Sequence, residues 1–175
     1  YTPPVPAFTG IKTFDHYPLD ELVRYIDWTP FFQTWELSGR FPAILEDPVV
    51  GESAAKLYAD AQQMLQRIIR EKLLTARAVI GLFPANRVGD DDTEIYTDDT
   101  RQHVLTLLHS LRQQDEKPPG RPNRALADFI APKESGLKDY IGAFAVTAGI
   151  GTEALTKKYK EQHDDYNAIL VQALA

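Results

Sequence analysis

Asp27 is the residue whose surroundings most suggest ligand chemistry, since it lies within the aromatic stretch YIDWTPFF at residues 25–32. One interpretation is an acidic residue at a helix start, where backbone N–H groups stabilise its charge. The other is a carboxylate in an apolar cleft that binds the cationic group of a ligand, because a buried charge requires a partner. Arg24 is three residues back on the preceding predicted helix, and no basic residue stands at helical spacing. The residues alone leave both interpretations open.

A glycine pair forms the second candidate, Gly149-x-Gly151-x-x-Ala154, which follows a predicted strand and opens a predicted helix. This spacing matches the dinucleotide-binding pattern. That pattern also requires a second strand, with an acidic residue about 20 positions further on. Residues 171–175 contain no acid. The pair therefore favours a strand-to-helix turn, and a Rossmann-type enzyme stays the less favoured alternative.

Other polar clusters offer no self-contained catalytic or metal site. The acidic runs at 90–92, 98–99 and 164–165 lack the alternating ligands and central Gly of a calcium loop, which favours turns and helix starts. His16, His103, His109 and His163 are too scattered for a zinc motif. The sequence contains neither a G-x-S-x-G elbow nor a Walker phosphate loop. It therefore predicts no catalytic residue and no metal ligand.

The composition is that of one globular domain, with 175 residues, 43% of them hydrophobic and 25% charged. The net charge of −6 argues against a broad basic face for nucleic acid. The absence of Cys excludes disulfides and thiolate chemistry and suits a reducing compartment. Apolar runs are too short to span a bilayer, and no signal peptide is visible, so we expect neither membrane association nor export.

The patterning predicts a mixture of helices and strands. Pro3, Pro4 and Pro6 indicate a linker over residues 1–17. Apolar spacing predicts helices at 18–26, at 52–74 and at 152–175, and another begun by Thr29 as N-cap with Pro30 next to it and ending near residue 39. Short apolar runs predict strands at 78–83, 93–96, 126–130 and 140–147, whereas 104–111 suits either a helix or a strand. The last helix lacks a stop signal, so we expect a truncated domain.

Several unusual segments occur in an order that resembles one known family. They are YIDWTPFF (25–32), ILED (44–47), VVG (49–51), GLFPANRVGDD (81–91), EIY (94–96), LRQQ (111–114), ADFIAPK (127–133), DYIGAFAVT (139–147) and HDDYN (163–167), with YTPPV at residues 1–5. Together they closely resemble the activation domain of cobalamin-dependent methionine synthase.

That resemblance implies an α+β fold with a twisted antiparallel sheet flanked by helices, which favours a strand at 104–111. Residues 18–175 would be the first part of the activation domain, with its C-terminal part absent. In this family the enzyme moves a methyl group from 5-methyltetrahydrofolate to homocysteine. The activation domain binds S-adenosylmethionine and supports reductive methylation of inactive cob(II)alamin.

The resemblance also implies partners and one site residue. Asp27 would bind the amino group of the methionine part of S-adenosylmethionine, in a partial site, because a later R-P-A-P-G-Y segment is missing. Cobalamin would be held mainly by another module of the same polypeptide, zinc only in the full enzyme, and the electron donor would be a flavodoxin-like protein or a reductase. The isolated chain would be a non-competent fragment of a cytoplasmic methyltransferase. The alternative is a stand-alone corrinoid- or protein-binding module.

Overall fold

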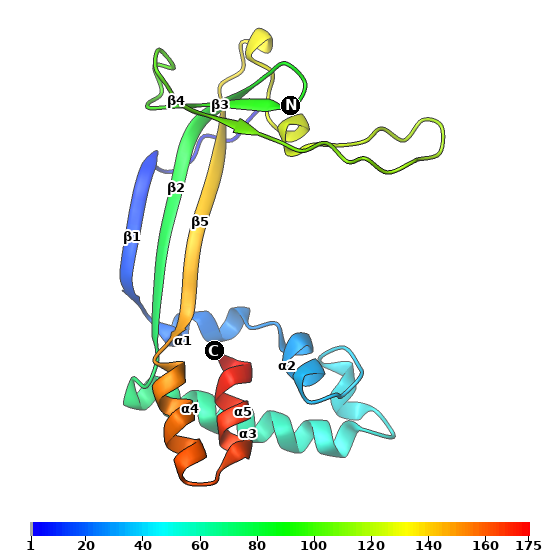
Figure 1. The fold of residues 1–175 in the computed structure, drawn as a ribbon, viewed down its shortest axis with the longest axis vertical. Coiled ribbons are helices and arrows are strands. Elements are labelled where there is room, and N and C mark those ends of the chain that lie inside the picture. The colour runs from blue at the N-terminus through cyan, green and yellow to red at the C-terminus, as the bar shows by residue number, and fades with distance from the viewer. Residues whose placement is uncertain (1) are drawn as a thin grey trace. The chain divides into compact units, whose positions relative to one another are not determined.

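The computed structural model describes residues 2–175 and has an α+β fold, as expected (Figure 1). Within this range the strands form one five-stranded sheet of order β1-β2-β3-β4, in which β5 also pairs with β2. Tyr1, which belongs to the YTPPV part of the resemblance and to the expected linker, lies outside the described residues. None of the helices described is both long and apolar enough to cross a membrane.

The elements follow one another in a mixed order along the chain. In sequence they are β1 (Gly10–Tyr17), α1 (Leu19–Leu22), α2 (Trp28–Thr34), α3 (Gly51–Glu71), β2 (Thr75–Val88), β3 (Asp92–Tyr96), β4 (Val104–His109), β5 (Asp139–Ile150), α4 (Thr152–Glu161) and α5 (Asp165–Leu174). Short 3₁₀ turns lie at Val23–Tyr25, Ala43–Glu46, Leu126–Phe129 and Lys133–Ser135.

The chain divides into two compact units that cut across the long strands. One unit comprises the chain up to Thr13 together with Val79–Ala145, and the other comprises Phe14–Ala78 together with Val146–Ala175. The first is mainly strands and loops, and the second holds the long helices.

The helical unit is organised around α3, whose buried residues recur every three or four positions, as an amphipathic helix requires. This stripe packs with the aromatic side chains of α2 and with buried residues of α4 and α5. The core comprises Trp28, Phe31, Phe32, Ile44, Ala54, Leu57, Ala61, Met64, Leu65, Ile68, Leu74, Leu155, Tyr159, Ala168, Leu170 and Val171. Helix α3 ends where Lys72 adopts a left-handed conformation with φ 51°.

The other unit is built on the antiparallel ladder β2-β3-β4, in which Ala85 pairs with Ile95 and Thr93 with Leu108. Asn86 is its buried polar centre. The Asn86 side chain donates to the carbonyls of Ala131 (3.0 Å) and Leu137 (2.9 Å) and accepts from Arg101 (2.7 Å). This part of the GLFPANRVGDD segment therefore satisfies loop backbone groups that would otherwise be unpaired.

The predicted strands at 78–83, 93–96 and 140–147 are confirmed as parts of β2, β3 and β5. Residues 104–109 form β4, as the resemblance favoured. Strand β2 continues to Val88, beyond the expected end at residue 83. Its connection to β3 is therefore a tight turn at Gly89 (φ 60°), whereas a strand that ended at residue 83 would require a long connection.

Four expectations about elements are wrong. The helix expected to begin with Thr29 as N-cap and to end near residue 39 is α2, which begins at Trp28 and ends at Thr34. Residues 10–17 form β1 rather than linker. Residues 126–129 form a 3₁₀ turn rather than a strand, because Asp128 accepts a hydrogen bond from the backbone N–H of Ala125 (2.9 Å) and closes the turn. The predicted helix 152–175 is two helices: His163 is left-handed (φ 57°), and Asp164 caps α5 by accepting from Asn167 N–H (3.0 Å).

Candidate functional site

Asp27 lies at the N-cap position of α2, where the sequence had suggested Thr29. Its backbone is extended (φ −82°, ψ 107°), and its Oδ1 accepts a hydrogen bond from the N–H of Thr29 at 3.0 Å. Asp is a favoured N-cap because its oxygen pairs with a backbone donor that has no partner inside the helix. The helix-start interpretation of Asp27 is therefore confirmed.

The same carboxylate also borders a groove of about 280 Å³. From the α2 side, Ile26, Pro30, Phe31 and Thr34 line it, and from α5 the lining residues are Ile169, Gln172, Ala173 and Leu174. Most of these side chains are apolar. The groove thus places one carboxylate beside apolar walls, as the second interpretation of Asp27 requires.

In one respect the groove differs from the expected cleft, because Asp27 is exposed. Water can solvate an exposed carboxylate, so Asp27 does not carry the penalty of an unpaired buried charge. Within residues 2–175 no Lys, Arg or His forms an ion pair with it. Arg24 instead packs its guanidinium against the ring of Tyr25, 5.1 Å from the centroid. The carboxylate is therefore available to a cation from outside the chain.

An aromatic cluster fixes the position of α2 and hence of Asp27. Trp28, the first residue of α2, packs edge-on against Phe31 (5.3 Å between ring centroids) and against Tyr58 of α3 (4.9 Å). Phe32 is fully buried and stacks on Phe41 at 6.2 Å. Edge-on and offset ring pairs of this kind are favourable. The YIDWTPFF segment thus supplies both the carboxylate and the packing that holds it.

The α5 wall of the groove was missed by the sequence analysis, because 152–175 was expected to be one continuous helix. The Asp164-x-x-Asn167 spacing carries the signal that could have located the break, since Asp is a strong N-cap residue. With the break in place, α5 packs with α2 and α3, and its last turn reaches the Asp27 groove.

The glycine pair serves a tight turn. Gly151 has φ 107°, and a Cβ there would lie 2.9 Å from the carbonyl oxygen of Leu73. A Cβ on Gly149 would lie 3.1 Å from the Ala175 side chain. Helix α4 is followed by α5 rather than by a strand, and the β2-β3-β4 ladder is antiparallel. The strand–helix–strand context of a dinucleotide site is therefore missing from residues 139–175, and the Rossmann alternative is overturned.

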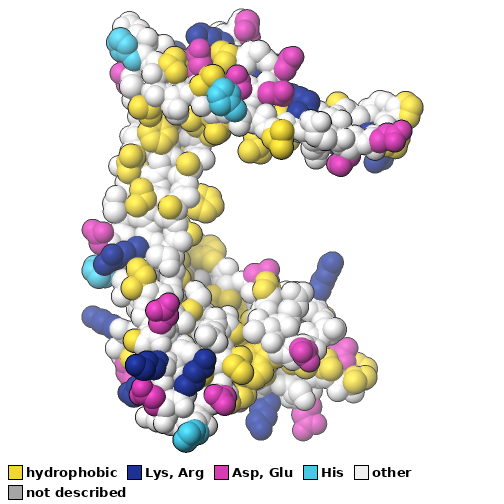
Figure 2. All heavy atoms as spheres, viewed as in Figure 1, with side chains coloured by type: hydrophobic (Ala, Val, Ile, Leu, Met, Phe, Trp, Pro, Cys, Tyr) yellow, Lys and Arg dark blue, Asp and Glu magenta, His cyan; other side chains and the backbone are white. Residues whose placement is uncertain are grey.

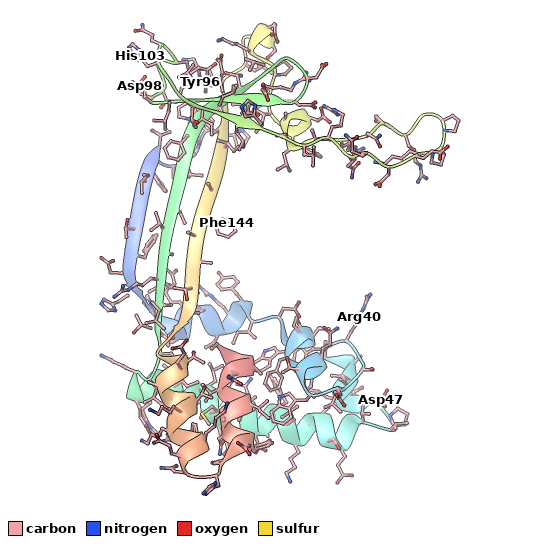
Figure 3. All side chains as sticks on the ribbon, in the orientation of Figure 1. Arg40, Asp47, Tyr96, Asp98, His103 and Phe144 are labelled. Atoms are coloured by element: carbon pink, nitrogen blue, oxygen red, sulfur yellow. The ribbon has the colours of Figure 1, made fainter. Side chains whose placement is uncertain are left out.

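The acidic runs occupy structural positions. Asp91 pairs with Arg112 (2.7 Å), and Asp92 pairs with His109 (2.8 Å). Asp98, labelled with His103 in Figure 3, accepts from the backbone and hydroxyl of Thr100, and these hydrogen bonds lower its pKa. Asp47 likewise accepts from the N–H groups of Val49 and Val50 just before α3, which lowers its pKa (Figure 3). In the described part of the chain, no three His, Asp or Glu side chains gather as metal ligands.

The antiparallel β2-β3-β4 ladder and the succession of β5, α4 and α5 place this chain among α+β modules outside the Rossmann class. Comparison with known proteins identifies which one. The family model described as vitamin B12 dependent methionine synthase, activation domain, matches residues 18–175. The chain belongs to this family.

One similar solved structure is described as the crystal structure of the MetH reactivation domain bound to AdoHcy. It is 56% identical to this chain in sequence and superposes with a TM-score of 0.91. The match covers 100% of the present chain and 53% of the other, so this chain spans about half the length of that relative.

Proposed function

We propose that this chain is part of a cobalamin-dependent methionine synthase and contributes to binding S-adenosylmethionine for reductive methylation of inactive cob(II)alamin. The observation that carries the proposal is the Asp27 carboxylate, which borders an apolar groove and forms no ion pair within residues 2–175, in a chain that belongs to this family. A similar reactivation domain is described with AdoHcy bound. AdoHcy and S-adenosylmethionine share the amino acid and adenosyl groups.

The chemistry of the groove suits the amino acid end of this ligand. An ammonium can donate a charge-assisted hydrogen bond to the Asp27 carboxylate, and such bonds are stronger than neutral ones. The Asp27 Oδ1 is already oriented by Thr29 N–H, so the carboxylate is held in place before the ligand arrives. The apolar side chains of Phe31, Ile169 and Leu174 would contact the methylene groups of the ligand.

Cobalamin would be bound mainly by another module of the same polypeptide and would supply the metal centre that accepts the methyl group. A flavodoxin-like protein or a reductase would supply the electron. Zinc would belong to the full enzyme only, and the protein would act in the cytoplasm. This chain would contribute ligand contacts and a docking surface, with no catalytic residue of its own.

The experiment is calorimetric titration of the wild-type chain and the Asp27→Asn variant with three ligands. S-adenosylmethionine and AdoHcy both carry the α-ammonium, whereas 5′-methylthioadenosine lacks the whole amino acid group. We expect Asp27→Asn to weaken the first two by roughly tenfold, because the exposed carboxylate loses one charge-assisted hydrogen bond. Binding of 5′-methylthioadenosine should not change.

The Asp20→Asn variant is the matched control, since Asp20 is an exposed acid in the first turn of α1. It changes the net charge equally and should leave all three affinities unaltered. Weakening of S-adenosylmethionine alone would assign Asp27 to the sulfonium rather than the ammonium. Equal affinities of wild type and Asp27→Asn for S-adenosylmethionine and AdoHcy, in this chain and in the full-length enzyme, would contradict the proposal.

A further inference from the structure

A second groove in the helical unit, of about 520 Å³, shares no lining residue with the Asp27 groove. One wall is a face of α3 that presents Ser53, Lys56, Leu57 and Asp60. The opposite wall contains Trp35 and Leu37, which follow α2, and Tyr166 of α5. We call this groove the α3 slot.

The polar wall of the α3 slot carries both signs of charge. Lys56 and Asp60 are four residues apart and so lie on one face of α3. Within residues 2–175 they form no ion pair with each other. A basic residue on the N-terminal side of an acidic one is the less favourable order for such a pair. Both charged groups are therefore available to a ligand that carries the complementary charges.

The Asp60 carboxylate is held in position from α5. The Tyr166 hydroxyl donates to Asp60 Oδ2 at 2.7 Å, which leaves Oδ1 without a partner among residues 2–175. The Tyr166 ring lies 5.1 Å from that of Trp35, at 54° between planes. Tyr166 is 42% exposed and Trp35 is half-buried, so one face of this ring pair is accessible. Leu37 extends the apolar surface, and Leu57, which is only 6% exposed, borders the slot from the core.

We propose that the α3 slot binds a zwitterionic α-amino acid with an apolar side chain. The ligand's ammonium donates to Asp60 Oδ1, and its carboxylate accepts from Lys56 and from the Ser53 hydroxyl. Its side chain packs against Trp35, Tyr166 and the two leucines. A ligand that carries only one charge cannot pair with both Lys56 and Asp60, and the protein group left over then faces a like charge or no charge. The Lys56–Asp60 pair therefore selects a zwitterion.

Trp35 provides a direct readout of the α3 slot. The chain has two Trp residues, and the other, Trp28, is buried in the aromatic core. We use L-norleucine as the probe and follow tryptophan fluorescence. Three truncated probes test each part of the ligand: n-pentylamine lacks the carboxylate, hexanoate lacks the ammonium, and glycine lacks the side chain. We expect saturable binding of L-norleucine and at least tenfold weaker binding of each truncated probe.

Substitutions in the chain test the same contacts from the protein side. Asp60→Asn keeps an acceptor for Tyr166 but removes the charge, and Lys56→Met removes the ammonium but keeps the length of the side chain. Each should weaken L-norleucine binding about tenfold or more. Lys158→Met, at an exposed position of α4, and Asp20→Asn are matched controls and should bind like the wild type. Trp35→Phe should abolish the fluorescence change, with calorimetry then measuring the affinity.

Thermal melts of every variant separate loss of the slot from loss of folding. Two results would overturn the proposal. One is no saturable binding of L-norleucine with a Kd below about 10 mM, measured by fluorescence and by calorimetry. The other is equal binding of L-norleucine, n-pentylamine and hexanoate, because the α3 slot would then select apolar character without reading either charge.

Discussion

At the residue scale, Asp27 combines a structural and a proposed ligand role that substitutions can separate. Asp27→Asn keeps an N-cap acceptor for Thr29 N–H, whereas Asp27→Ala removes it. We expect Asp27→Ala to lower the free energy of unfolding by about 1 kcal/mol and Asp27→Asn to lower it by only a few tenths. Urea denaturation measures both. If Asn destabilised the chain as much as Ala, the charge rather than the cap would dominate the helix-start role.

Gly151 tests the structural role of the glycine pair. Its φ of 107° disfavours any residue with a side chain, and a Cβ added at Gly151 would lie only 2.9 Å from the carbonyl oxygen of Leu73. We expect Gly151→Ala to lower the free energy of unfolding by about 1–3 kcal/mol. Gly136→Ala is the control, since Gly136 also has positive φ (70°) but nothing within 4 Å of an added Cβ. A smaller effect at Gly151 than at Gly136 would contradict the close packing, and loss of measurable NAD binding would contradict the turn role.

At the element scale, Arg112 links the 3₁₀ turn Leu126–Phe129 to the turn that joins β2 to β3. Its guanidinium donates to both carboxylate oxygens of Asp128 (2.8 and 2.9 Å), to Asp91 Oδ1 and to the carbonyl of Asn123. Arg112 holds the pKa of Asp128 well below its usual range. The contribution of this pair to stability is therefore present above the ordinary carboxyl pKa and is lost as pH falls through the lowered pKa.

We expect Arg112→Lys to speed amide hydrogen exchange across residues 110–130, because a single ammonium cannot reproduce the two-pronged pairing with Asp128. Exchange in α3 should not change. Arg121→Lys, an exposed position in the same loop, is the control and should leave exchange as in the wild type. Unchanged exchange in Arg112→Lys would mean that backbone hydrogen bonds alone hold the turn.

Helix α5 carries a titratable contact with α3. Partial burial of the Tyr166 hydroxyl, followed by its hydrogen bond to Asp60, raises the pKa of Tyr166 from 10.0 to about 12. Because the protonated phenol is favoured in the folded state, this stabilisation is complete below pH 10 and is lost as pH rises toward 12. Tyr166→Phe should therefore show a smaller loss of stability than wild type between those pH values, measured by urea midpoints. A parallel loss in both proteins would contradict this assignment.

At the scale of the whole molecule, exposed apolar side chains lie on the strands (Figure 2). Strand β4 is an edge of the sheet, and all its residues are exposed, including Leu105 (54%). Phe144 of β5 is 76% exposed and projects from the ribbon in Figure 3. Uncovered edges and apolar patches favour contact with another chain.

We therefore expect the isolated chain to associate as its concentration rises. Leu105→Lys should reduce association, because a charged residue on an edge strand opposes pairing with another chain. Lys substituted at Ala154, exposed on α4, controls for the added charge and should associate like the wild type. Sedimentation velocity over a range of concentrations measures both. If the wild-type chain stayed monomeric at every concentration, the exposed apolar residues of β4 and β5 would not drive association.

The sequence by itself determined most of the local elements. Apolar residues every three or four positions placed α3, and short apolar runs placed the centres of β2, β3 and β5. These signals are strong because each depends on neighbours within a few residues. Asp27 was located in the same way, as an acid at the start of an aromatic helix, but local pattern left its helix-start and ligand-binding interpretations open. The family resemblance added the strand at β4.

The tertiary structure decided which distant residues meet. Only the fold brings the last turn of α5 to Asp27, the Tyr166 hydroxyl to Asp60, and Arg112 to Asp128. These contacts join residues 16 to 147 positions apart, and local periodicity carries no information about them. The error at 10–17 has the same cause, since pairing with the distant strand β2 made this segment a strand. The turn at 126–129 is closed locally by the hydrogen bond from Ala125 N–H to Asp128, and Arg112 then pairs with Asp128 from a distance. The break before α5 was encoded locally, but the Asp164 cap competed with a continuous apolar pattern.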